Sequence, residues 1–354
     1  MSVVFLILPL LGAPSDSQAF AIRTERVYVG TGEIIENGII LIEKGKIAAV
    51  GPRLKIPVGV KVIDATKLSA YPGLVLAWST RGVDSGAGGD ETKSVAEAFW
   101  PFGRVYDPLL REGFTAVGLV PPRFYDTVAG QGVVVRPLSR KREEIILEKS
   151  SFLCVTYSPG GKRRLAELFG KKSGVGALAA SGKMPVVISV NNPTYALSMV
   201  EFLAPYRSMR KSIRPTGDLV STLPALLRLK SPCLLPAELV YRRGTAYQRN
   251  IAAALSHSKV PVCLLPRVDS NVGYETFRLD VARLIRTGLS ETDALKAVTS
   301  VPARVLGVDW RIGTIEKGKD ADILLLDGNL FDPKAHIKRI YIAGEQVYAE
   351  EGKP

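Results

Sequence analysis

Short apolar runs separated by glycine-containing turns characterise both ends of the chain. Towards the N-terminus, residues 27–29, 38–42 and 46–50 are rich in β-branched side chains. Towards the C-terminus, residues 322–326 and 340–348 show the same pattern. Runs of this length and composition, bounded by turns, are typical of β-strands. We therefore expect one small β-sandwich that is built from both termini.

The middle of the chain alternates between strand-like and helix-like patterns. Residues 74–78, 114–120, 184–190 and 260–265 form apolar runs of the length of a buried strand. Residues 275–287 instead carry apolar side chains at helical spacing. Strands that alternate with helices over a span of roughly 240 residues predict an α/β fold with a parallel, TIM-like (β/α)8 barrel, either complete or shortened.

The first residues have the pattern of a targeting segment. Residues 3–13 are almost wholly apolar, and Ala19-Phe20-Ala21 then supplies a small-residue cleavage site. The apolar run is too short to span a membrane, and no Lys or Arg precedes it. We predict a cleaved signal peptide, export to the periplasm or the extracellular space, and no transmembrane span; the alternative is a buried N-terminal strand.

These patterns divide the chain into four segments. They are a signal peptide at 1–21, a first sandwich part at 22–70, the barrel at 71–308 and a second sandwich part at 309–354. A chain of 354 residues with 46% hydrophobic and 23% charged residues has the composition of a globular protein with a large core. Its three cysteines show no paired spacing, which argues against a disulfide framework.

Two motifs carry a resemblance to a known family. They are GKIAAVG…VIDATKLSAYPGLVLAWSTRGV, between residues 45 and 83, and IGTIEKGKDADILLLDG at 312–328. Both resemble the metal-dependent amidohydrolase superfamily, and most closely its imidazolonepropionase-like branch. The resemblance implies a barrel with a composite sandwich. It also implies hydrolysis of carbon–nitrogen bonds other than peptide bonds, with zinc or another divalent metal as cofactor.

The positions at which this family binds its metal carry other residues. In the family, a His-x-His pair ends the first barrel strand. The matching residues here are Trp78 and Thr80, or Ala77 and Ser79 after a one-residue slip. Ser189 occupies the position of a later metal-binding histidine. The resemblance thus describes a degenerate member that lacks the metal-ligand histidines.

The last strands depart from the family pattern as well. Asn191 lies two residues after Ser189. Arg267 stands where the family carries its catalytic aspartate, and Asp269 follows two residues later. Residues 204–259 should contain two more histidine-bearing strands and show neither. The one histidine in that stretch, His257, precedes a strand instead of ending one.

No other catalytic machinery stands out. His336, the second of two histidines, falls in the C-terminal β region, and no nucleophile elbow or phosphate-binding glycine loop occurs. Carboxylates that remain as candidate metal ligands are Asp84, Asp90, Glu238 and Asp269. Scattered carboxylates are usually solvated. We therefore predict no catalytic residue and no metal or other cofactor, with zinc or another divalent metal only if the chain is an active hydrolase.

Positive charge is concentrated in residues 136–250. This segment has 20 Lys/Arg and 7 Asp/Glu, and its excess equals the net charge of +13 of the whole chain. The functional interpretation is an anionic partner, and the alternative is a solvated basic surface. The export signal and the absence of a motif that recognises bases argue against a nucleic-acid partner.

Two hypotheses follow for the function. The first is a non-catalytic, exported binding or scaffolding protein, which forms a homo-oligomer or pairs with an active paralogue. The second is a metal-dependent hydrolase of carbon–nitrogen bonds with atypical ligands. In the first case, either Trp78 plugs the barrel mouth or Arg267 and Arg81 bind a small anion there, because a guanidinium fork suits carboxylate or phosphate.

Overall fold

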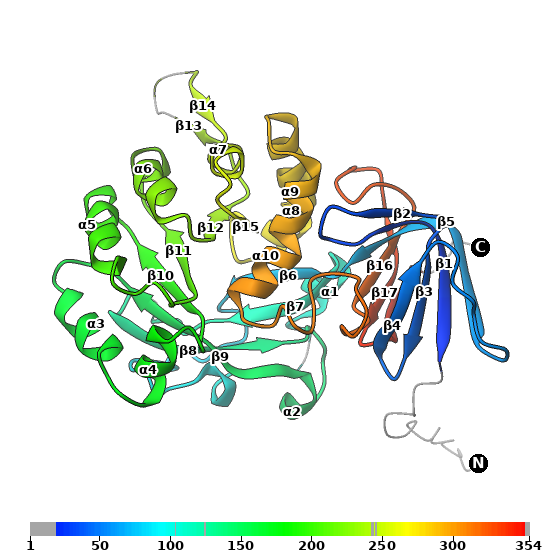
Figure 1. Cartoon of the computed structure of the whole chain (residues 1–354), viewed down its shortest axis with the longest axis horizontal. Coiled ribbons are helices and arrows are strands. Elements are labelled where there is room, and N and C mark those ends of the chain that lie inside the picture. Colours follow the sequence, from blue (N-terminus) through cyan, green and yellow to red (C-terminus); the bar gives the residue numbers. More distant parts are fainter. Residues whose placement is uncertain (1–18, 103, 124, 242–243, 245, 351–354) are drawn as a thin grey trace, which may run out of the picture.

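The computed structural model describes residues 19–102, 104–123, 125–241, 244 and 246–350, which form two sheets that lie side by side with helices around one of them (Figure 1). The predicted signal peptide lies outside the described residues except for its last three. Phe20 and Ala21 are already part of the first strand, and Ala21 is fully buried. The predicted cleavage after Ala21 would therefore fall two residues inside that strand.

The first sheet is built from both ends of the chain, as the sequence predicts. Its eight strands are β1 (Phe20–Tyr28), β2 (Ile34–Glu36), β3 (Ile39–Glu43), β4 (Lys46–Gly51), β5 (Lys61–Pro72), β16 (Ile323–Leu326), β17 (Ile337–Ile342) and β18 (Glu345–Ala349). The N-terminal and C-terminal strands form one continuous sheet because β16 pairs antiparallel with β5, and β5 also pairs parallel with β1. Isoleucine, leucine and alanine side chains from both parts fill a separate apolar core of this sheet.

The second sheet forms the barrel. Its strands, in spatial order, are β15 (Val262–Leu265), β12 (Cys233–Pro236), β11 (Lys211–Pro215), β10 (Val186–Val190), β9 (Ile146–Thr156), β8 (Val128–Val135), β7 (Phe114–Leu119) and β6 (Leu74–Ser79). The expectation of a fully parallel barrel is wrong at one strand, since β8 runs antiparallel to both β7 and β9. The segment 204–259 does contain two strands of the barrel, β11 and β12, although no histidine ends either of them.

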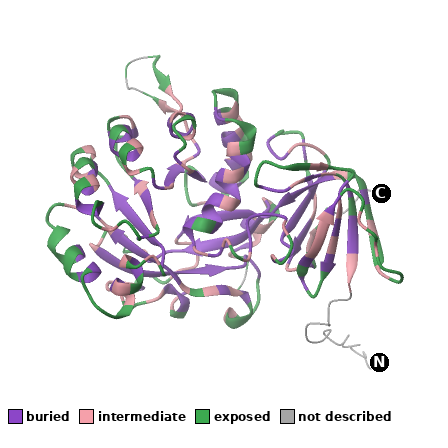
Figure 2. Ribbon diagram, viewed as in Figure 1, coloured by how far each residue is buried: buried purple, intermediate pink, exposed green. Residues whose placement is uncertain are grey.

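Helices cover the outside of the barrel, and the strands that form its wall are almost entirely buried (Figure 2). The helical segments are η1 (Val95–Glu97), α1 (Asp107–Arg111), α2 (Arg142–Ile145), α3 (Lys162–Phe169), α4 (Gly174–Ala180), α5 (Pro193–Leu203), α6 (Leu219–Leu229), α7 (Ile251–His257), α8 (Asn271–Arg286), α9 (Glu291–Val298) and α10 (Ser300–Val305). A short hairpin of β13 (Val240–Tyr241) and β14 (Gln248–Arg249) projects from the barrel. None of the helices in the described ranges has the length and apolarity that a membrane crossing requires.

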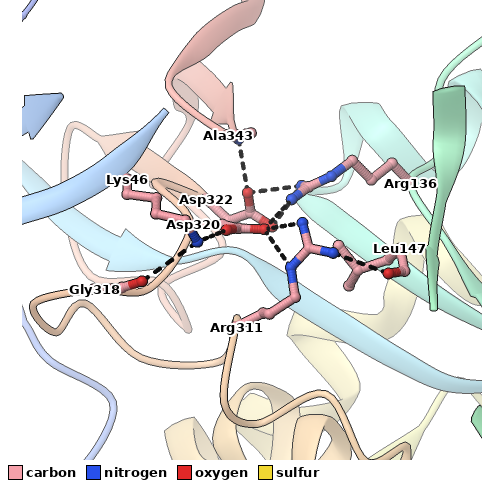
Figure 3. Close-up of polar contacts among 8 residues, drawn as sticks. All are labelled: Lys46, Arg136, Leu147, Arg311, Gly318, Asp320, Asp322 and Ala343. Atoms are coloured by element: carbon pink, nitrogen blue, oxygen red, sulfur yellow. Dashed lines mark hydrogen bonds and ion pairs between the residues drawn. The ribbon is translucent and has the colours of Figure 1, made fainter. Parts of the chain in front are cut away.

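A buried ionic network joins the barrel to the first sheet (Figure 3). Arg136, just after β8, donates to Asp320 at 2.8 Å and to Asp322 at 2.7 Å. Lys46 and Arg311 also contact the Asp320 carboxylate, at 2.9 and 2.7 Å. Both aspartates belong to the C-terminal family motif and are almost completely buried. Buried carboxylates need such partners, so this network fixes how the two sheets are joined.

Candidate functional site at the barrel mouth

The mouth of the barrel lies at the carboxyl ends of its strands, where Asp269 contacts the end of β6. Ser79 Oγ donates to the two carboxylate oxygens of Asp269 at 2.9 and 3.1 Å. The Thr80 backbone N–H donates to the same carboxylate at 2.8 Å, and Thr80 Oγ1 donates at 3.2 Å. Asp269 follows β15, so these bonds connect the first and last strands of the barrel order.

Tyr274 on α8 is a further partner of this carboxylate. Its hydroxyl donates to Asp269, and its side chain is fully buried. Burial is the main cause that raises the pKa of Tyr274, and the negative charge of Asp269 raises it further. The guanidinium of Arg81 lies 5.6 Å from the centre of the Tyr274 ring, and Arg81 Nε donates to the Val105 carbonyl.

Trp78, at the end of β6, is buried inside the barrel with 7% of its surface exposed. The guanidinium of Arg214 on β11 lies over the indole ring, 4.2 Å from its centre. Because β6 and β11 are not neighbours in the sheet, this contact crosses the barrel interior. Burial lowers the pKa of Arg214. A cation held against an aromatic face therefore occupies the interior near the mouth.

Ser189 on β10 lies in register with Arg214, so both side chains face the same side of the sheet. The Ser189 hydroxyl is buried and has no hydrogen-bond partner among the described residues. Asn191, just after β10, is exposed. Cys154 on β9 is one of three buried free cysteines, and burial raises its pKa, so it is a poor nucleophile.

The two arginines of the predicted anion site do not meet. Arg267 is 53% exposed and pairs with Glu238 at 3.5 Å. Arg81 is directed to Val105 and the Tyr274 ring, as described above. Among the described residues, no contact joins the two guanidinium groups. Glu238, another of the candidate metal ligands, is likewise occupied by an arginine.

The residues at the mouth do not fit a catalytic divalent metal. Such a site needs about three histidine, cysteine or carboxylate ligands. The positions at which the resembled family has its metal ligands carry an indole, hydroxyl groups and a guanidinium here. Both carboxylate oxygens of Asp269 already accept hydrogen bonds. In the part of the chain that the structure describes, no three histidine, cysteine, aspartate or glutamate side chains are grouped to hold an ion. The Arg214 cation would also repel one.

Sequence patterns identified Trp78, Thr80 and Asp269 as residues of interest, but missed Arg214 and Tyr274. The strand that carries Arg214 has an irregular, partly polar sequence, so its basic residue is not distinguishable from surface positions. Tyr274 lies in the first turn of α8, five residues after Asp269, and this proximity in the sequence was the available signal.

Known families and curated proteins match short parts of the chain. A model described as Amidohydrolase family matches residues 268–347, which include Asp269 and both buried aspartates of the ionic network. An N-acetylglucosamine-6-phosphate deacetylase of Bos taurus is 42% identical over 69 residues, which are 19% of this chain and 16% of that protein. Adenine deaminase 1 of Carboxydothermus hydrogenoformans is 38% identical over 73 residues, 21% of this chain and 11% of that protein. The matched segments thus span far less than two thirds of these curated relatives.

Solved structures share the fold over nearly the whole chain. An amidohydrolase from Thermotoga maritima MSB8 is similar with a TM-score of 0.76 and 22% identity, over 94% of this chain and 100% of that one. An adenosine deaminase from Xanthomonas campestris, solved with bound zinc, gives a TM-score of 0.55 and 16% identity, over 94% of this chain and 93% of that one. The resemblance to the amidohydrolase superfamily is confirmed, as is the barrel with an added sheet from the termini. The imidazolonepropionase-like branch stays a prediction.

Proposed function

We propose that this chain is a non-catalytic protein with the amidohydrolase fold, which binds or organises other molecules instead of hydrolysing them. The observation that carries the proposal is the side-chain closure of the mouth. The Asp269 carboxylate is saturated by Ser79, Thr80 and Tyr274. Arg214 and Trp78 fill the barrel interior nearby. A mouth that is closed in this way has neither a metal-ligand set nor a free general base.

The proposal predicts that the protein holds no stoichiometric metal and hydrolyses no amide. The test is elemental analysis of protein purified with added zinc, together with a hydrolysis assay on N-acetylglucosamine 6-phosphate and on a cyclic amide. We expect well under one zinc ion per chain and no turnover. About one tightly held metal per chain, with turnover that Asp269→Asn abolishes and the surface variant Asp126→Asn retains, would contradict the proposal.

The second candidate is a hydrolase of carbon–nitrogen bonds in non-peptide amides or cyclic amides, with atypical ligands for zinc or another divalent metal. The family match at 268–347 favours it, because the match includes Asp269. Two of the curated proteins that match part of the chain are named as a deacetylase and a deaminase. The same experiment separates the two candidates. Pairing with an active paralogue, which the first candidate allows, is tested by co-purification from the native cell.

We also propose that the protein is exported. The support is the apolar run at 3–13 followed by Ala19-Phe20-Ala21. We expect mass spectrometry of the native protein to give a mature chain that begins at Ile22. An intact Met1 on protein recovered from the cytoplasm would contradict export. A cleavage site upstream of Phe20 would keep the proposal and preserve the whole of β1.

A further inference from the structure

A pocket lies between the first sheet and the barrel, away from the barrel mouth. Its volume is about 310 Å³, at the small end of the range of roughly 300–1,000 Å³ for ligand pockets. The hairpin of β1 and β2 forms one wall, the start of α9 forms another, and the loop after β16 closes the third side. Figure 1 shows this hairpin extending towards α8 and α9.

Two stacked tyrosines form the floor of the pocket. The rings of Tyr28 and Tyr71 are 4.3 Å apart and nearly parallel, at 10°. Phe331, which is 8% exposed, adds a third aromatic ring to the lining. Aromatic faces carry negative electrostatic potential, so this floor attracts a cation as well as apolar surface.

The hydroxyl of Tyr71 is the unusual group in this floor. Tyr71 is only 1% exposed, and its hydroxyl has no hydrogen-bond partner among the described residues. Leaving a buried polar group without a partner costs about 1–3 kcal/mol. Burial raises the pKa of Tyr71 first, and the nearby Tyr28 hydroxyl and Glu291 carboxylate also raise it. Tyr71 lines the pocket together with Tyr28 and Glu291.

Two carboxylates, Glu33 and Glu291, line the pocket, and no lysine or arginine does. Neither carboxylate forms an ion pair within the described part of the chain, although Asn329 Nδ2 donates to Glu291. This acidic rim occurs in a chain with a formal net charge of +13. The two carboxylates disfavour an anionic ligand by repulsion. A multivalent metal ion is disfavoured because the described residues hold no group of three ligands.

We propose that this pocket binds a small organic ammonium ion with an apolar or aromatic body. The body packs on the stacked tyrosines and Phe331, an ammonium N–H donates to the Tyr71 hydroxyl oxygen, and Glu291 and Glu33 balance the charge. The Tyr71 hydroxyl then gains a partner that it lacks among the described residues. The proposal is independent of hydrolysis at the barrel mouth, because none of the mouth residues lines this pocket.

The test is calorimetric titration with three probes of similar shape. They are 2-phenylethylammonium, the neutral 2-phenylethanol and the anionic 3-phenylpropanoate. We expect the ammonium probe to bind at least about tenfold more tightly than the neutral one, because a charge-assisted contact is involved. The anion should not bind. If all three probes bind equally, or if none binds, the pocket is not an ammonium site.

Variants then assign the binding to the named groups. Glu291→Gln and Tyr71→Phe should each weaken binding of 2-phenylethylammonium by about tenfold. Glu36→Gln is the matched control, since Glu36 is an exposed carboxylate on β2 that does not line the pocket, and it should leave affinity unchanged. Thermal unfolding of Tyr71→Phe gives a second readout: a variant that loses only an unpartnered hydroxyl should be at least as stable as the wild type. Marked destabilisation, or unchanged affinity in Glu291→Gln, would overturn the proposal.

Discussion

Trp78 and Arg214 together place an apolar ring and a fixed cation inside the barrel. The indole is 7% exposed, and the guanidinium lies 4.2 Å from its centre. In the resembled family, the matching end of the first barrel strand carries a metal-binding histidine. The aromatic ring at this position is packed core where the resembled family binds an ion, and the cation beside it is an arginine side chain.

Replacing Trp78 with alanine should destabilise the protein strongly. Removal of a buried aromatic side chain costs about 3–5 kcal/mol, because it loses apolar contacts and leaves a cavity beside Arg214. The control is Trp310→Ala, since Trp310 is 63% exposed and should contribute little. Denaturant unfolding of both variants measures the difference. Equal stabilities for the two variants would show that Trp78 is not part of the core.

Some residues of the candidate site could be predicted from the sequence, and others could not. Trp78, Thr80 and Asp269 could be found from the chain alone, because they lie at or beside the positions of a recognisable motif. Arg214 could not, since its contact with Trp78 depends on how two strands distant in sequence face each other across the barrel. The interaction of Asp269 with Ser79 depends on the loop that follows β15, and apolar periodicity carries no information about the conformation of a loop.

At the scale of elements, the barrel departs from its expected form at β8. The run of apolar residues that forms this strand is the same whether the strand runs parallel or antiparallel, so the pattern predicts a strand without its direction. The connections do contain the information. Only residues 120–127 separate β7 from β8, and a parallel crossover needs a dozen residues or more. Connection length therefore could have predicted the antiparallel strand.

Gly73 joins β5 of the first sheet to β6 of the barrel and has no room for a side chain. A Cβ atom at this position would lie 2.0 Å from Thr115 Oγ1. Gly73→Ala should therefore cost about 1–3 kcal/mol by overpacking. Gly160→Ala is the matched control, because a Cβ there would meet nothing within 4 Å. Chemical denaturation that finds both substitutions neutral would show that the Thr115 side chain can move away from a Cβ atom at position 73.

At the scale of the whole molecule, the network around Asp320 couples the barrel to the composite sheet. Burial raises the pKa of Asp320, but contacts with Lys46, Arg136 and Arg311 outweigh it, so the pKa lies below its ordinary value of 3.8. The charged form is therefore stabilised by folding. This contribution is present above the ordinary pKa and is lost as the pH falls through the lower pKa of the folded protein.

Asp320→Asn should accordingly destabilise the protein at neutral pH and flatten the acid limb of its stability profile. Breaking a buried ion pair costs about 3–5 kcal/mol. The stability difference from wild type should shrink below about pH 4, as the carboxyl group of the wild type takes up a proton. Asp126→Asn, which removes an exposed partner of Arg123, is the control. A difference that stays constant down to strongly acidic pH would contradict this role.

The pairing of β5 with β16 also sets the order in which strands of the first sheet can pair during synthesis. As the chain emerges from the ribosome, β5 finds β1 early, but its other edge, at Ser69 and Ala70, pairs with Leu326 and Leu325, which are made only after all the barrel strands. Contacts of such large sequence separation fold slowly. Throughout synthesis of the barrel, the nascent protein therefore carries an open strand edge that is able to pair with another chain. A polypeptide that stalls before β16 would keep that edge permanently.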